Sequence, residues 1–125
     1  MKDNTPKSKY FKIEEFTCKD GTQVPEEYYD NVQELMDNLD VLREHLGYPI
    51  VINSGYRTAE YNKSVGGAKK SQHLTASAAD IKINVTPSVV QKAIKKLMKD
   101  GDMKKGGLGI YSTFTHYDIG KSRTW

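Results

Sequence analysis

Two histidines and one aspartate, His73, Asp80 and His116, are the residues of this sequence that best match a catalytic metal site. Such a ligand set is common around catalytic zinc, because it leaves a fourth position where a water molecule is polarised. The set is weakly diagnostic by itself, since solvated or hydrogen-bonded histidines often lie near an aspartate. Asp80 adds local support because it lies in an apolar strand, where burying an unpaired charge is costly. A bound metal ion would compensate that charge.

Arg57 and Asp118 are two further charged residues that could act beside such a site. Arg57 follows a short apolar run, so its guanidinium can be aimed from a strand end at a carboxylate or a developing oxyanion. The alternative for Arg57 is a surface ion pair with Glu60. Asp118 follows His116 by two residues, so both side chains fall on one face of a strand. It could be a general base, a residue that orients a histidine, or an ordinary carboxylate at the end of a hairpin.

Two amphipathic helices are expected to form the framework around these residues. The first begins at Pro25, which suits the first helical position, and ends at Gly47. The second follows Thr86 as its N-cap and ends near Gly101. In each helix, apolar residues at three- and four-residue spacing predict one buried face. These residues are Val32, Leu35, Met36, Leu39, Leu42 and Leu46 in the first helix, and Val90, Ala93, Ile94 and Leu97 in the second.

Short extended segments are expected to form a sheet against these helices. Residues 49–53 contain three consecutive β-branched apolar residues, which at this length indicates a buried strand. Residues 78–85 alternate apolar and polar side chains, which predicts a strand with Asp80 on the face opposite its isoleucines. Residues 107–120 are predicted to form two strands joined by a turn at 112–113. The expected fold class is α+β, with two principal helices packed on a small, largely antiparallel sheet.

The remaining segments complete the expected organisation. Residues 10–16 are predicted to be extended, and residues 58–64 to form a short helix capped by Thr58. Residues 1–9 are polar and are expected to be a flexible N-terminal tail. The single domain is therefore expected to span residues 10–125.

Charge, cysteine content and the lengths of apolar runs argue against several functions for this chain of 125 residues. The net charge is +3 and the lysines occur as scattered pairs, which gives little support to nucleic-acid binding. The single cysteine, Cys18, cannot form an internal disulfide or a multi-thiolate zinc site. No apolar run approaches the roughly 18 residues that a membrane helix needs, so no membrane insertion is expected. The first residues lack the apolar core of a signal peptide, so no signal peptide is expected in this chain.

Several separated motifs occur together in a fixed order, with Asp80 seven residues after His73. The motifs are Ser54-Gly55-Tyr56-Arg57, Val65-Gly66-Gly67-Ala68, Ser71-Gln72-His73-Leu74 leading to Ala78-Ala79-Asp80-Ile81, and Gly107-Leu108-Gly109-Ile110-Tyr111 with His116-Tyr117-Asp118-Ile119-Gly120 and Trp125. Together they resemble the zinc D-Ala-D-Ala carboxypeptidase family over residues 10–125. That family includes vancomycin-resistance dipeptidases and phage endolysin peptidases, and it shares its fold with hedgehog domains and lysostaphin-type enzymes.

The resemblance implies one Zn²⁺ ion with His73, Asp80 and His116 as ligands. It also implies that Arg57 stabilises the substrate carbonyl or its oxyanion. Ser71 matches the family's serine that hydrogen-bonds the bound peptide.

The sequence departs from the family pattern at two positions. Ala76 occupies a position that is usually glycine, a change that an unstrained turn could absorb. Thr113 stands where the family often has its carboxylate base, and threonine cannot accept the proton. A subgroup carries a His-x-Asp pair, so Asp118 is the candidate base here. In an alternative alignment, Asp118 is a zinc ligand and His116 is the histidine on the base side.

The resulting hypothesis is a zinc-dependent peptidase that hydrolyses bonds in peptidoglycan stem peptides or cross-links, of the D-Ala-D-Ala carboxypeptidase or endopeptidase type. Its expected partners are peptidoglycan peptides, without nucleic acid, and it is expected to be a monomer. It is expected to act on the cell wall, after phage-type release or after processing of a longer precursor. The rival hypothesis is a non-catalytic cell-wall-binding or structural module that keeps zinc for folding. Thr113 favours the rival, whereas Arg57 and Ser71 favour the enzyme.

Overall fold

A five-stranded mixed sheet forms the centre of the structure, a computed structural model that describes residues 4–125. The strands lie in the order β1-β2-β4-β3-β5, and every neighbouring pair is antiparallel except the parallel pair of β3 and β5. Their bounds are Ile50–Ser54 for β1, Ala78–Ile83 for β2, Gly107–Ile110 for β3, Thr115–Asp118 for β4 and Arg123–Thr124 for β5. The expected strands are present, and β5 is an addition that the sequence did not predict.

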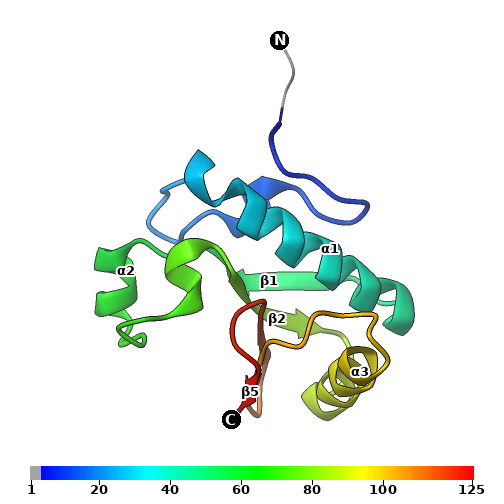
Figure 1. The fold of residues 1–125 in the computed structure, drawn as a ribbon. Helices are drawn as coiled ribbons and strands as arrows, with labels where there is room; N and C mark the ends of the chain where they lie inside the picture. Colours follow the sequence, from blue (N-terminus) through cyan, green and yellow to red (C-terminus); the bar gives the residue numbers. More distant parts are fainter. Residues whose placement is uncertain (1–3) are drawn as a thin grey trace.

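Two long helices, α1 and α3, contact each other and the sheet (Figure 1). Helix α1 spans Tyr29–Leu46 and ends at Gly47, whose left-handed backbone has a φ of 75°. Helix α3 spans Pro87–Lys99, and its N-cap is Thr86. The short helix α2 spans Ala59–Ser64, and the side chain of its N-cap Thr58 accepts a hydrogen bond from the backbone N–H of Tyr61. The predicted α+β fold with two principal helices is confirmed.

Three single turns of 3₁₀ helix change the expected boundaries. The turn η2, Glu26–Tyr28, precedes α1, so the α-helix begins at Tyr29 rather than at Pro25. The turn η1, Ile13–Phe16, lies in the segment that was expected to be extended. It forms because the Glu15 carboxylate accepts the backbone N–H of Lys12 at 2.8 Å, and because the turn buries Phe16 completely. The third turn, η3, spans Gln72–Thr75.

The two faces of the sheet carry different kinds of residue. Ile81, Leu108 and Tyr117 are buried and pack with the apolar faces of α1 and α3 in one core. The side chains of successive strand residues alternate between faces, so Asp80 and His116, which lie directly opposite each other on β2 and β4, share the other face. The helices therefore stabilise one side of the sheet and leave the opposite side for polar residues.

A β-bulge at the end of β1 shapes the entrance to that polar face. Ile52 lies opposite Ile81, whereas Ser54 lies opposite Asp80, so β1 has one residue more than β2 at this point. Such a bulge re-aims the residues beyond it. The segment that carries Gly55 and Arg57 leaves the sheet here.

The N-terminal segment is attached to α1 by hydrogen bonds. The Asp40 carboxylate accepts the Ser8 hydroxyl at 2.9 Å and the backbone N–H of Lys9 at 3.1 Å, and Gln33 accepts the backbone N–H of Lys7 at 3.1 Å. The part of the expected flexible tail at residues 1–3 lies outside the described residues. Within residues 4–125, no helix combines the length and the apolar character needed to cross a membrane.

Candidate metal centre

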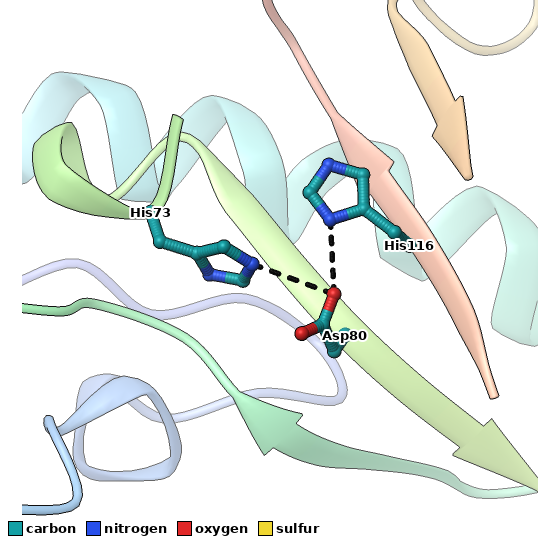
Figure 2. Close-up of side chains that lie close together, drawn as sticks. All are labelled: His73, Asp80 and His116. Atoms are coloured by element: carbon teal, nitrogen blue, oxygen red, sulfur yellow. Dashed lines mark hydrogen bonds and ion pairs between the residues drawn. The ribbon is translucent and has the colours of Figure 1, made fainter. Parts of the chain in front are cut away.

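His73, Asp80 and His116 converge on one point, as the sequence predicted (Figure 2). Asp80 projects from β2, His116 from the neighbouring strand β4, and His73 from the turn η3. The Nδ1 atom of His116 lies 2.9 Å from Asp80 Oδ1, and the Nε2 atom of His73 lies 3.4 Å from the same oxygen. One ligand atom from each of the three residues lies within 4.8 Å of the other two. All three residues are buried.

The hydrogen bonds on the far sides of both rings determine which nitrogens face Asp80. His73 donates its Nδ1–H to the backbone carbonyl of Gly55 at 2.7 Å. His116 donates its Nε2–H to the Asp118 carboxylate at 2.8 Å. In the neutral tautomers, the lone pairs of His73 Nε2 and His116 Nδ1 therefore point at an anionic oxygen. A proton on an imidazole or a bound cation can occupy the space between these donors, and two imidazoles with one carboxylate fit a metal ion such as Zn²⁺.

The Asp80 carboxylate is held in its charged form. Burial alone would raise its pKa, but hydrogen bonds and positive charge from His116 and His73 outweigh that effect and place the pKa well below its ordinary value. Burial alone would lower the pKa of His116. The hydrogen bonds to Asp118 and Asp80 outweigh that effect and raise the pKa above its ordinary value. The charge that the sequence placed in an apolar strand is therefore paired.

The Arg57 guanidinium lies against the site and is held by three acceptors. Its Nη2 atom lies 3.3 Å from Asp80 Oδ2, its Nε donates to the Ser54 hydroxyl at 3.1 Å, and its Nη1 donates to the side-chain carbonyl of Asn62 at 3.2 Å. Only 16% of the Arg57 side chain is exposed. Glu60, the alternative partner considered from the sequence, is not among these acceptors.

Asp118 lies behind His116, on the side of the ring away from Asp80. Its Oδ1 atom accepts the backbone N–H groups of Gly107 and Gly120, both at 3.0 Å, and its Oδ2 atom accepts the Nε2–H of His116. The residue has no exposed surface. Burial alone would raise the pKa of Asp118. The hydrogen bonds from His116, Gly120 and Gly107 lower it by more, so the pKa lies below its ordinary value. This geometry matches a carboxylate that orients a metal-binding histidine.

The backbone around η3 holds His73 and Ser71 in place. The Ser71 hydroxyl accepts the backbone N–H of His73 at 3.2 Å and so caps the turn. Ala76 ends the turn in the left-handed region with a φ of 57°. The turn is therefore not unstrained, because this conformation costs a residue with a Cβ about 1–2 kcal/mol. The Ala76 methyl group is buried in the core, which offsets part of that cost.

Gly55 connects the first ligand to the N-terminal part of the chain. A Cβ at this position would meet the Phe16 Cα at 2.8 Å, so only glycine allows η1 to pack this closely. The backbone N–H of Tyr56 also donates to the Phe16 carbonyl at 2.9 Å. The packing of Gly55 and the hydrogen bond of Tyr56 thus fix the position of the Gly55 carbonyl, which orients His73.

The three candidate ligands line a cleft of about 760 Å³. Trp125 forms part of one wall, with its ring centroid 4.9 Å from that of His116, and the Arg123 guanidinium lies 4.3 Å from the Trp125 ring. The indole N–H of Trp125 donates to the Tyr111 hydroxyl at 2.8 Å. Ser71 and Arg57 also line the cleft, whereas Asp118 does not.

Several residues of this site were not identified from the sequence. Trp125 was part of a motif, but the strand β5 that positions it contains only two residues and has no periodic pattern. The glycine at position 109, within a predicted strand, was a sequence signal of close packing. A Cβ there would meet both the Trp125 ring and the His116 Cβ at 2.9 Å. Asn62, which contacts Arg57, had no distinguishing pattern.

Two histidines and an aspartate on the open face of an α+β sheet are the donor set of a zinc hydrolase. A model of the peptidase M15 family matches residues 9–118, which is most of the chain. The chain belongs to this family, the zinc D-Ala-D-Ala carboxypeptidase type of metallopeptidase. No curated protein matches the chain. Family membership and the His-Asp-His group together support a zinc-dependent hydrolase of peptides.

Proposed function

We propose that this protein is a zinc peptidase that cleaves stem peptides or cross-links of bacterial peptidoglycan. The observation that carries the proposal is the convergence of His73 Nε2, Asp80 Oδ1 and His116 Nδ1 in the lining of a cleft. Family membership supports the peptidase class and a cell-wall substrate. When bound at these three atoms, zinc supplies a Lewis acid that polarises a carbonyl and lowers the pKa of water.

The residues around the cleft have distinct proposed roles. Arg57 has five N–H donors, of which three serve Ser54, Asn62 and Asp80, so others remain for the carbonyl oxygen of a substrate. Such a donor stabilises the negative charge that develops on that oxygen. Ser71 uses its oxygen to cap η3, and its O–H can donate to the peptide backbone of a substrate.

Asp118 is proposed to orient His116 instead of accepting a proton from the attacking water. The carboxylate lies across the imidazole ring from the ligand atom Nδ1, and both of its oxygens already accept hydrogen bonds. A general base must come within hydrogen-bond reach of the proton that it removes. The base role that the family pattern indicated for Asp118 therefore has no geometric support.

The charge of the cleft favours a peptide that carries carboxylates. Arg57, Lys70 and Arg123 line it, whereas Asp80 is the only acidic side chain that lines it within residues 4–125. The peptides of peptidoglycan carry free carboxylates on several residues, and their methyl side chains suit the aromatic wall. We further propose that the protein acts on the cell wall, reached by phage-type release or after processing of a longer precursor.

A non-catalytic zinc module is the second candidate function, and one observation favours it. Thr113, at the position of the family's usual base, is exposed and does not line the cleft, and Asp80 is already a candidate metal ligand. The module would bind wall peptides through Arg57 and Ser71 without hydrolysing them.

Mass spectrometry of purified peptidoglycan fragments separates the two candidates. Fragments are incubated with the zinc-loaded protein, with the His73→Ala variant and with the wild type after chelation. Pairs of products whose summed masses exceed that of the fragment by one water, formed only by the zinc-loaded wild type, would support the peptidase and identify the bond. Retention of intact fragments on the immobilised protein without any product would support the binding module.

A further inference from the structure

Asn62 is a buried amide that touches the candidate substrate-binding arginine. It lies in α2, with 4% of its surface exposed. Its side-chain carbonyl accepts Arg57 Nη1 at 3.2 Å, and its NH₂ group donates to the backbone carbonyl of Ala68 at 2.9 Å. A guanidinium only donates and a backbone carbonyl only accepts, so both contacts require an amide in this one orientation.

The Asn62 contact determines how the guanidinium is shared between the metal centre and the cleft. Arg57 already points one nitrogen at Asp80, which is a candidate ligand. Without an acceptor for Nη1, the planar guanidinium can turn to bind both oxygens of Asp80, because such a two-bond pair is the preferred geometry. Asn62 therefore holds the second nitrogen away from Asp80.

Gly67 shows that the chain is packed closely around this pair. A Cβ on Gly67 would overlap the Asn62 side-chain oxygen and lie 3.1 Å from Arg57 Nη1. The backbone N–H of Gly67 also donates to the Asn62 backbone carbonyl at 2.8 Å. The loop from Gly66 to Lys70, which lines the cleft, is thus attached to Arg57 through Asn62.

We infer that Asn62 is a positioning residue that fixes the Arg57 guanidinium for the substrate carbonyl and couples it to the cleft loop. Only the predicted effect on kcat rests on the proposed peptidase function. Asn62 does not line the cleft, so its effect on turnover passes through Arg57. Displacement of a positioned group by about an ångström can lower a rate by as much as 10²-fold.

A double-mutant cycle tests this coupling on peptidoglycan fragments with the zinc-loaded protein. Asn62→Ala is expected to lower kcat by about 10- to 100-fold while zinc content stays unchanged. In the Arg57→Ala background, the same substitution should change kcat less than about twofold, because the guanidinium is already absent. Equal effects in both backgrounds would overturn the inference.

Asn38→Ala is the control for the loss of an amide with two hydrogen bonds, although Asn38 is only half-buried. Asn38 also makes two hydrogen bonds, donating to the Glu34 carbonyl at 2.9 Å and accepting the Lys104 backbone N–H at 2.7 Å, but it lies outside the cleft. Asn38→Ala should lower the melting temperature without changing kcat. An equal loss of kcat in this control would show that general destabilisation, and not Arg57, explains the effect.

A spectroscopic measurement keeps the inference testable if the wild type shows no turnover. Nitrogen-15 NMR of the side chain should show hindered rotation of the Arg57 guanidinium in the wild type, with separate Nη1 and Nη2 signals. Gly67→Ala keeps Asn62 but displaces its oxygen, so both Gly67→Ala and Asn62→Ala should shift the Nη1 signal, because Nη1 loses its acceptor and turns toward Asp80. Unchanged signals in folded variants would overturn the inference, whereas absent turnover with the expected shift of the Nη1 signal would count against the peptidase function alone.

Discussion

Replacement of Asp118 by asparagine is expected to weaken zinc binding while the domain remains folded. An asparagine has one acceptor oxygen and one NH₂ donor where the carboxylate has two acceptors. If its NH₂ group faces His116, it meets the Nε2–H group, which is also a donor. His116 can relieve this only by moving its proton to Nδ1, the atom that must bind the metal. If its oxygen faces His116, the NH₂ group meets the backbone N–H groups of Gly107 and Gly120, which now donate to Oδ1 at 3.0 Å. Neither orientation preserves all the bonds that orient the histidine.

The expected size of this effect follows from the role of such partners. Loss of the residue that orients a metal-binding histidine typically lowers metal affinity or activity 10- to 100-fold. That range corresponds to about 1.4–2.7 kcal/mol of zinc-binding free energy. Removal of a hydrogen bond to a charged group costs about 1.5–3 kcal/mol of folding stability. A domain with an unfolding free energy of about 5–15 kcal/mol therefore remains folded.

Zinc titration in competition with a chelator measures the effect at one fixed pH. Asp40→Asn is the matched control, because the Asp40 carboxylate also accepts two backbone N–H groups, those of Lys9 and Tyr10, but holds the N-terminal segment instead of a histidine. Asp40→Asn should lower the melting temperature without changing zinc affinity. Asp118→Asn should lower both.

Three other results for Asp118→Asn would contradict this reasoning. Unchanged zinc affinity with turnover lowered by roughly 10² to 10⁴ would support the general-base role instead. Complete loss of zinc would support the alignment in which Asp118 is a ligand. Unchanged zinc affinity and unchanged turnover would leave an ordinary buried carboxylate.

Three further substitutions test the rest of the site. His73→Ala should reduce the zinc content from about one equivalent to near none by metal analysis, and full occupancy would exclude His73 as a ligand. Arg57→Ala should lower turnover by about 10² or more with zinc retained, and loss of zinc would assign Arg57 a structural role at Asp80. Gly109→Ala should displace Trp125 and cost about 1–3 kcal/mol of unfolding free energy. Trp125 is the single tryptophan of the chain, so unchanged fluorescence in this variant would show that the predicted displacement does not occur.

The helices and central strands could be predicted because each has a strong local pattern. The apolar spacing in α1 and α3 and the alternation in β2 reflect burial of one face, and the structure confirms these elements. The convergence of His73, Asp80 and His116 was also predicted, although the residues themselves left alternatives open. Family resemblance supplied the long-range information, because the sequence spacing of 36 residues between Asp80 and His116 does not indicate contact.

The unpredicted features depend on packing between distant segments. The partners of Asp118 could not be identified, because the strand pairing that brings Gly107 opposite it is not visible in one sequence. The bulge after Ile52 depends on how β1 aligns with β2. The left-handed conformation of Ala76 was missed because the residue there has no local preference for it. Such features arise when the tertiary fold overrides local preference.

The close packing of Gly55 against Phe16 limits how this metal site could be transferred to another protein. The three ligands span residues 73–116, but the carbonyl that orients His73 belongs to Gly55, and Gly55 is packed against η1 at residues 13–16. Arg123 and Trp125 close the other side of the site. A graft of η3, β2 and β4 alone would carry all three donor atoms and lose the contacts that orient them. Transfer of this candidate metal site to another protein would therefore need nearly the whole domain.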